Sequence, residues 1–453
     1  MNNYLRFSII VLIYLGCILQ PISARATNKI IREPYLQNYS HKGSIHLLLK
    51  TKYPSQVRVY YSQHLKSLSM HASDLMVRSD HDLLLQHLKP GIEYYYRLDY
   101  YDEKLGWLPL HEAHKQFTVP DHRPFHKEFT AWILGDPGTY GAKKFHKKFK
   151  HSQLDVLEAL NTFDPFNPDL VFTLGDNVYP YGSEEIFDRA FFNVYGFVMS
   201  QVPFYTSFGN HDFGIYDKHQ IYSISCPETK GVYYDLFSLP TKGEAGGVPS
   251  HTEAYYSVDF RSAHFVVLDT VGLECHLLEM LDWLEQDLAK VPDHKWKIVM
   301  SHHPITDKFF KNSKKLNHLD DHVENLFFTR LSKTLNKHKV DLMISGHYHR
   351  YQRTYPMVKD DVHSSFNVRV SEANTARYER GEGIIYIIAG NGGSAWKNDK
   401  LEKSRFTSFV SYEPGALLMR FSPEVLKLFM VGRDKEGTKI LDSLKIINTY
   451  KQI

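Results

Sequence analysis

Short apolar runs recur through the second part of the chain, and each is followed by small residues and a polar side chain. They occupy residues 129–134, 169–174, 202–208, 297–300 and 340–345. Short apolar runs bounded by turn-forming residues predict buried strands. Between them, residues 276–291 and 324–338 repeat apolar side chains at the spacing of an amphipathic helix. This alternation predicts an α/β fold in which β-sheets are flanked by helices.

The first part of the chain carries a different pattern. Residues 44–50, 56–61 and 93–98 are rich in β-branched and aromatic side chains, and no helical periodicity separates them. Short strands of this kind predict a small β-sandwich over residues 27–122. A proline-containing linker then leads into an α/β domain over residues 123–453. The sandwich holds no cluster of ligand-type residues, which favours a structural or docking role.

Later apolar runs extend the second domain. They lie at residues 383–388, 417–421, 426–431 and 439–446, and they predict further strands.

The N-terminus predicts export. An apolar stretch over residues 7–19 follows Arg6, and Ala24-Arg25-Ala26 has the small residues that a signal peptidase reads. The stretch is short for a membrane span. We therefore expect residues 1–26 to be the cleaved signal peptide of a secreted or periplasmic protein without stable membrane insertion. An uncleaved anchor and a lipoprotein modified at Cys17 are the alternatives.

The composition of the chain says more about its partners than about its fold. A chain of 453 residues is long enough for two or three domains. Its net charge of +3 gives no reason to expect a nucleic acid or an anionic membrane as a partner. Cys226 and Cys275 would remain after cleavage, and either a disulfide or two reduced thiols fit the sequence. A homodimer also stays open.

The polar residues that follow the apolar runs form a metal-binding set. In chain order they are Asp136, Asp176, Tyr179, Asn210, His302, His347 and His349. Carboxylate and phenolate oxygens suit a hard, highly charged cation, and phenolate suits ferric iron in particular. Imidazole suits zinc, iron or manganese. Together these side chains are enough to hold two metal ions about one shared carboxylate.

The set resembles that of the purple acid phosphatases within the metallophosphoesterase superfamily. Residues 32–37 look like the start of that family's N-terminal fibronectin type III-like domain, and residues 347–356 and 389–393 look like its histidine motif and its late glycine-rich turn.

This resemblance implies a place for each ligand. It assigns Fe(3+) to Asp136, Tyr179 and His349. It assigns a divalent Fe, Zn or Mn ion to Asn210, His302 and His347, and it makes Asp176 the bridge between the two ions.

The resemblance also implies a reaction. We expect a secreted acid phosphatase that hydrolyses phosphate monoesters by attack of a metal-bound hydroxide, with His211 protonating the leaving alcohol or supporting Asn210. Asp212 stands where the family commonly has Glu, and this bears on the orientation and pKa of His211. The family's further substrate-side histidines have no clear counterpart among His303, His318 and His322.

Three other functions compete with this one. A phosphodiesterase or nucleotide hydrolase would use the same dinuclear site, and the metal ligands do not distinguish it from a phosphatase. A catalytically silent binding protein is disfavoured because the ligand set is complete. Oxidative chemistry at a ferric–divalent centre would be a side activity of the same site.

Overall fold

The computed structural model describes most of the chain. The described residues are 28–111, 113–141, 152–165, 168–213, 231–305, 321–359, 366–368, 376–393, 395, 406–434 and 436–449. The predicted signal peptide lies outside them, as do Cys226, His318 and His322, so these predictions stay untested. Cys275 is disulfide-bonded. This favours the disulfide over the reduced thiols for Cys275, and a pairing with Cys226 stays one of the alternatives that the sequence left open.

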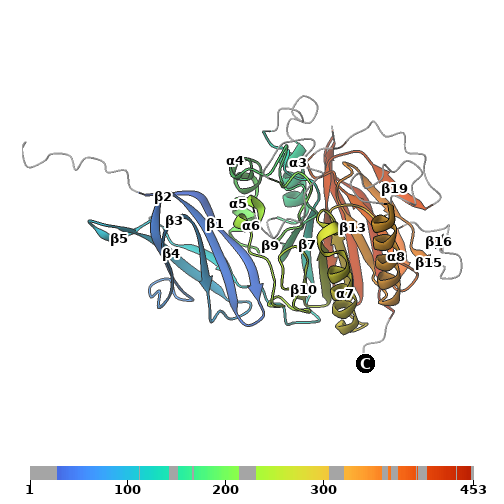
Figure 1. Ribbon diagram of the computed structural model, residues 1–453, viewed down its shortest axis with the longest axis horizontal. Helices are drawn as coiled ribbons and strands as arrows, with labels where there is room; N and C mark the ends of the chain where they lie inside the picture. The colour runs from blue at the N-terminus through green and yellow to red at the C-terminus, as the bar shows by residue number, and fades with distance from the viewer. Residues whose placement is uncertain are drawn as a thin grey trace, which may run out of the picture.

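The N-terminal part is a β-rich unit at one end of an elongated molecule (Figure 1). Its six strands join in one hydrogen-bonded sheet: β1 (Ile30–Ser40), β2 (Ser44–Ser62), β3 (Met70–Leu85), β4 (Glu93–Asp102), β5 (Gly106–Pro109) and β6 (Lys115–Thr118). Alternate apolar side chains such as Leu47, Leu49, Val57 and Val59 are buried in a core of its own. The fibronectin type III character of this unit stays a prediction.

The second part contains two large sheets. The first has the strand order β17-β22-β21-β20-β7-β8-β9. Its strands are β7 (Phe129–Leu134), β8 (Leu170–Thr173), β9 (Phe204–Tyr205), β17 (Arg377–Glu379), β20 (Gly415–Phe421), β21 (Val425–Asp434) and β22 (Gly437–Ile447). The second has the order β10-β11-β12-β13-β18-β14-β19. Its strands are β10 (Tyr256–Phe260), β11 (Ala263–Leu268), β12 (Trp296–Ser301), β13 (Leu342–Ser345), β14 (Tyr351–Thr354), β18 (Ile385–Ala389) and β19 (Thr407–Ser411).

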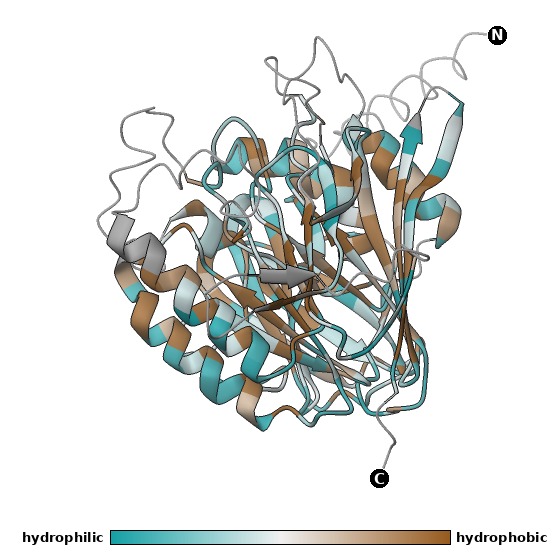
Figure 2. Ribbon diagram, turned by 90° about the vertical axis from the view of Figure 1, so that its right-hand side faces the viewer, coloured by the Kyte–Doolittle hydropathy of each residue, from teal (hydrophilic) through white to brown (hydrophobic). Residues whose placement is uncertain are grey.

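The two sheets pack together through their apolar faces. Val171 and Leu417 of the first sheet share one core with Phe265 and Ile344 of the second. Figure 2 shows the strands of the interior in the colours of apolar residues. A small ribbon of β15 (Met357–Lys359) and β16 (Phe366–Val368) lies outside both sheets.

Helices cover the outer faces. Apolar positions of α7 (Leu273–Lys290) and α8 (Asp321–Lys337) pack with Val299 and Met343 of the second sheet in a separate core. α3 (Ser152–Phe163) lies over β20, β21 and β22. The remaining helical segments are α4 (Glu184–Phe187), a π-helical turn (Asp188–Phe192), α5 (Asn193–Met199) and α6 (Val232–Leu236). Within the described residues, no helix is both long and apolar enough to cross a membrane.

The predicted α/β fold is therefore confirmed, with two differences in detail. The predicted strands at 44–50 and 56–61 form one long strand, β2, with irregular register between Lys50 and Val57. The sequence also gave no signal for β10, β11 or α3.

The N-terminal sheet is fixed to the rest of the molecule by polar contacts. Tyr35 Oη donates to the carbonyl oxygen of Leu236 at 2.6 Å. The buried guanidinium of Arg32 contacts Asp188 at 2.6 Å and Glu184 at 2.7 Å. His41 stacks on His122 of the linker with their ring centroids 3.8 Å apart.

Candidate metal centre

Parallel strands of both sheets end at one place, and the predicted ligands follow these ends. Asp136, Asp176 and Asn210 follow β7, β8 and β9 of the first sheet, whereas His302 and His347 follow β12 and β13 of the second. Polar ligands at the ends of predicted strands suggest a site on the rim of one sheet. The structure instead places it where the rims of two sheets meet, because β7–β9 and β11–β13 run parallel within their own sheets.

Three of these ligand residues have a left-handed backbone. Asp136, Asp176 and His347 have φ of 53°, 49° and 64°. This region costs a residue with a side chain about 1–2 kcal/mol. Such conformations persist where the surrounding structure enforces them, and they cluster at functional sites.

The neighbouring glycines allow the loops to approach closely. A Cβ atom on Gly209 would lie 1.9 Å from the Asp176 amide nitrogen, and one on Gly346 would lie 2.5 Å from Asp136 Oδ2. A side chain at either position would push two ligand loops apart.

One half of the site is centred on the Tyr179 hydroxyl. Its oxygen lies 3.1 Å from Asp136 Oδ1, 2.9 Å from Asp176 Oδ2 and 2.8 Å from His349 Nε2. A phenol has a single hydrogen, so it can donate fully to only one of the two carboxylate oxygens, whereas the role of His349 Nε2 depends on the tautomer of that ring. Burial and then the two carboxylates raise the pKa of Tyr179 well above its usual range.

The other half is centred on the amide oxygen of Asn210. His302 Nε2 lies 2.9 Å from Asn210 Oδ1, and His347 Nδ1 lies 3.1 Å from the same atom. His302 Nδ1 lies 2.8 Å from the carbonyl oxygen of Leu174, to which it donates its hydrogen. A neutral His302 therefore directs the lone pair of Nε2 at the lone pairs of Asn210 Oδ1.

Asp176 joins the two halves. Its Oδ2 faces Tyr179, and its Oδ1 lies 3.4 Å from His302 Nε2. Burial acts to raise the pKa of Asp176, but the imidazoles of His302 and His211 outweigh it and lower that pKa to about 2. Burial and the Asp176 carboxylate raise the pKa of Asp136 well above its usual range.

The donor set fits two cations. Oxygen and nitrogen atoms that can act as metal ligands face one another at 2.8–3.4 Å in both halves. Buried acceptors in such contact are unfavourable unless positive charge lies among them. Asp136 and Asp176 together with His302 form one of the groups whose donor atoms lie close enough to share an ion.

His211 lies beside this cluster rather than in it. Its backbone N–H donates to Asp176 Oδ1 at 2.7 Å, and its ring centroid is 4.6 Å from that of Tyr179. Nδ1 lies 2.7 Å from the carbonyl oxygen of Pro180, to which it donates. Nε2 is therefore the ring atom that gains or loses a proton.

Asp212 ties two ligand loops together. Oδ1 accepts the backbone N–H of Asn177 at 2.8 Å, and Oδ2 accepts both the Asn177 side-chain amide and the Gly209 N–H at 2.8 Å. Asn177 follows Asp176 in the chain, and Gly209 precedes Asn210. The carboxylate thus sets the distance between a ligand of each half.

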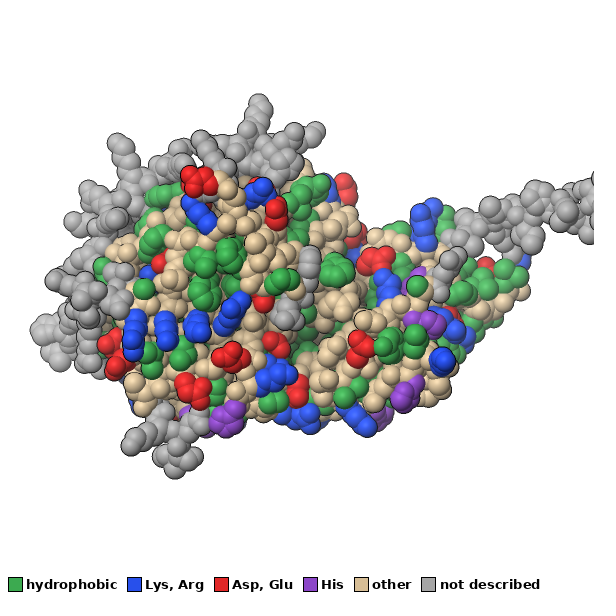
Figure 3. Space-filling model, turned by 180° about the vertical axis from the view of Figure 1, so that it is seen from behind, with side chains coloured by type: hydrophobic (Ala, Val, Ile, Leu, Met, Phe, Trp, Pro, Cys, Tyr) green, Lys and Arg blue, Asp and Glu red, His purple; other side chains and the backbone are tan. Residues whose placement is uncertain are grey.

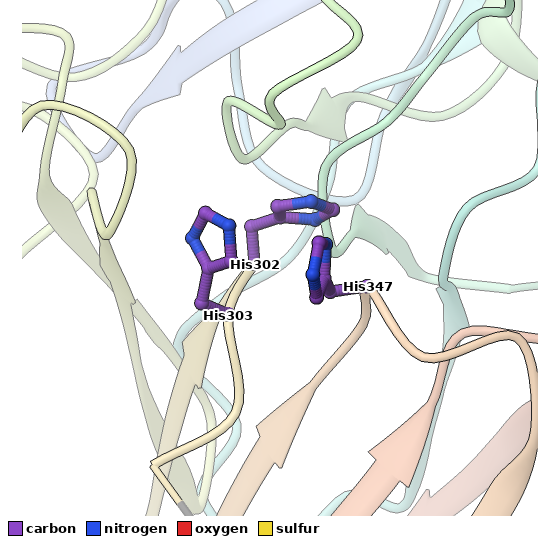
Figure 4. A group of neighbouring side chains, drawn as sticks. All are labelled: His302, His303 and His347. Atoms are coloured by element: carbon purple, nitrogen blue, oxygen red, sulfur yellow. The ribbon is translucent and has the colours of Figure 1, made fainter. Parts of the chain in front are cut away.

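His303 is the residue of the site that sequence reasoning left unassigned. Figure 4 shows it beside His302 and His347, and donor atoms of the three lie within 4.8 Å of one another. The backbone N–H of His303 donates to Thr270 Oγ1 at 2.8 Å, and Thr270 follows β11. The sequence showed that His303 is adjacent to His302, which could have indicated that it belongs to the site. The strand β11, which leads to Thr270 and so holds His303 in place, was not predicted.

Comparison with known proteins points to a metal-dependent phosphoesterase. Residues 129–351 match the family described as calcineurin-like phosphoesterase. The chain therefore contains a calcineurin-like metallophosphoesterase domain.

Purple acid phosphatases are among the similar proteins. The chain is 24% identical over 389 residues to "Probable inactive purple acid phosphatase 1" of Arabidopsis thaliana, covering 82% of this chain and 58% of that protein. It is 22% identical over 320 residues to "Nucleotide pyrophosphatase/phosphodiesterase" of Hordeum vulgare, covering 65% and 77%. The solved structure of a purple acid phosphatase from yellow lupin, Lupinus luteus, matches with a TM-score of 0.70 at 19% identity, covering 93% of this chain and 75% of that one.

These likenesses have different weight. The match to the lupin structure shows the fold alone, because the identity is low. The chain spans about half the length of the curated relatives it matches first.

Proposed function

We propose that this protein is a secreted acid phosphatase that hydrolyses phosphate monoesters at a dinuclear Fe(III)–M(II) centre. The observation that carries the proposal is the crowding of two carboxylate oxygens and one imidazole nitrogen around the hydroxyl of Tyr179. This arrangement is stable when Tyr179 is a phenolate bound to a cation, and phenolate oxygen suits ferric iron.

Asp136, Tyr179 and His349 would hold the ferric ion. Asn210, His302 and His347 would hold the divalent ion. Asp176 would bridge them, since its two oxygens face the two halves. When bound, two such cations would supply binding of phosphate oxygens, stabilisation of the charge that develops in phosphoryl transfer and acidification of water at low pH.

His211 would supply the proton that the leaving alkoxide needs. The Pro180 carbonyl holds Nδ1 in the donor role and so presents Nε2 as the transferable position. The His211 backbone N–H on Asp176 fixes the ring relative to the bridging carboxylate.

Two findings weigh on the assignment. Four relatives of this chain have names that include the word inactive. The site of this chain retains all seven predicted ligands in one connected cluster, which supports activity. Another relative is named a nucleotide pyrophosphatase/phosphodiesterase, which favours phosphodiester or pyrophosphate hydrolysis as the second candidate.

A metal count together with a visible spectrum tests the centre. We expect one iron and a second metal ion per chain, and a charge-transfer band that Tyr179→Phe abolishes. Tyr195→Phe, at a buried tyrosine of α5 outside the cluster, should leave the band unchanged. A colourless protein with two divalent ions, or a Tyr179→Phe protein that keeps its colour, would overturn the ferric assignment.

Relative rates on a phosphate monoester and a phosphate bis-ester with the same leaving group test the reaction. The proposal predicts faster turnover of the monoester at acidic pH. Faster turnover of the bis-ester would select the second candidate. Absence of hydrolysis of both by a metal-loaded protein would refute the proposal.

A further inference from the structure

Four basic side chains stand side by side on the outer face of the first sheet. The strand register places Arg420 of β20 opposite Lys427 of β21, Lys427 opposite Lys445 of β22, and Lys445 opposite Arg377 of β17. All four residues are exposed. Figure 3 shows a row of Lys and Arg side chains crossing this part of the molecule. We call these four residues the basic row.

The basic row is unfavourable for the isolated protein. Neighbouring strands lie about 4.8 Å apart, and like charges directly opposite each other destabilise a sheet. Elsewhere on this sheet Arg433 pairs with Asp155 and Glu158 of α3. Within the part of the chain that the structure describes, no carboxylate forms an ion pair with a member of the basic row. Arg420 donates one N–H to the carbonyl oxygen of Phe163, which does not neutralise its charge.

The basic row lies away from the metal centre. Arg420 pairs with Thr130, near the start of β7, whereas Asp136 follows the end of that strand. The metal centre therefore does not require these four charges. Binding of an anionic partner would relieve the repulsion among them.

We propose that the basic row binds a linear sulfated polysaccharide. The four cations form a single file across a sheet face, which matches a chain of regularly spaced anions better than the broad, two-dimensional charge of a membrane. One sugar ring extends such a chain by roughly the spacing between neighbouring strands, about 4.8 Å, so sulfates on successive rings can meet successive cations. Single-stranded nucleic acids stack successive bases on several aromatic rings that are combined with basic residues. Phe429 lies beside Arg420, with its ring centroid 5.9 Å from the guanidinium carbon, but one such ring does not make a series of stacking platforms.

Binding to heparin tests this proposal in the full-length protein. The test variant is Lys427→Glu/Lys445→Glu, and the matched control is Lys66→Glu/Lys104→Glu, which changes the net charge equally at two exposed lysines of the N-terminal part. We expect at least tenfold weaker heparin binding for the test variant at 0.1 M salt and less than a twofold change for the control. The slope of log K against log salt should fall by about two, since each neutralised anion contributes about 0.9.

Two further measurements make the result decisive. The test variant should keep its thermal stability or gain some, because reversing Lys427 and Lys445 converts repulsions with Arg420 and Arg377 into attractions. Hydrolysis of a small phosphate ester should not change, since the basic row is outside the site. Equal losses in the test and control variants, or no heparin binding by the original protein, would overturn the proposal. Tighter row-dependent binding to a single-stranded oligonucleotide or to anionic phospholipid vesicles than to heparin would show that the partner is wrong.

Discussion

Asp212→Asn tests whether one carboxylate sets the distance between the ligand loops. Asp212 is 1% exposed and accepts three N–H groups, two from Asn177 and one from Gly209. An asparagine there keeps one acceptor oxygen. In the more favourable of its two orientations, this oxygen takes the place of Asp212 Oδ2 and accepts the Asn177 side-chain N–H and the Gly209 N–H. The new NH2 group then takes the place of Oδ1 and faces the backbone N–H of Asn177. One buried donor then loses its partner, which costs about 1–3 kcal/mol.

Asp164→Asn is the matched control. Asp164 is 7% exposed and accepts the indole N–H of Trp132 at 2.9 Å, away from the site. An amide oxygen can accept that single bond equally well, so the expected change is within about 0.5 kcal/mol. For Asp212→Asn we expect a loss of about 2 kcal/mol in the free energy of unfolding by urea. We also expect a 10- to 100-fold fall in metal affinity or kcat/KM, as is typical for partners of metal ligands.

The refuting result is specific. If the Asp212 and Asp164 variants lose equal stability and both keep their metal content and kcat/KM, then Asp212 does not hold the two loops in register.

Four other expectations follow from the same structure. The stacked His122 has its pKa lowered to about 4, by burial and then by His41, so its contribution to stability is present above pH 6.5 and is lost as the pH falls toward 4; His122→Asn should flatten the pH dependence of Tm in this range, and an unchanged profile would contradict the linkage. Arg32→Met should cost about 2 kcal/mol, because it leaves carboxylates without their buried partner although these are 30–49% exposed; urea unfolding measures this, and a neutral result would show that the ion pairs contribute nothing. Chelation should lower Tm more at pH 7 than at pH 5, because protons compete with metal for groups such as Asp136, whose pKa burial raises; calorimetry with and without chelator should show the gap narrowing, and a wider gap at pH 5 would be inconsistent with carboxylate ligands. His211→Ala should slow esters of poor leaving groups more than those of good ones, and equal losses would remove its role as the acid.

Five of the seven candidate ligands stand out in the sequence because they lie just after apolar runs, and these are Asp136, Asp176, Asn210, His302 and His347. Buried parallel strands read as short continuous apolar segments, and their carboxyl ends meet at one edge of a sheet. Runs at 129–134 and 340–345 correspond to β7 and β13, which lead to Asp136 and His347. The local pattern and the global arrangement therefore agree at these positions.

Prediction from the sequence missed a strand in which a buried polar residue interrupts the apolar pattern. β11 contains His264, which is buried because Asp259 and Asp287 bond its two ring nitrogens at 3.1 and 2.8 Å. These contacts raise its pKa to about 9 against the effect of burial, which is the largest single influence and lowers it. Asp259 belongs to the neighbouring strand and Asp287 lies 23 residues away on α7, so neither contact can be read from the local sequence. The assignment of ligand strands to two sheets was missed for the same reason, since pairing between strands is set by long-range contacts.

The position of Asp176 explains why the two sheets and the metal centre depend on each other. Its loop follows β8 of the first sheet, and its Oδ1 faces His302, which follows β12 of the second. Cations held around this carboxylate would bind ligands from both sheets at once, so their binding free energy would add to the stability of the contact between the sheets. His211 contacts the same carboxylate only through its backbone N–H, which any residue but proline can supply. Loss of the Asp176 side chain should therefore reduce stability and activity together, whereas loss of the His211 ring should reduce activity more than stability, since the ring's contacts are with Pro180 and Tyr179 rather than with Asp176.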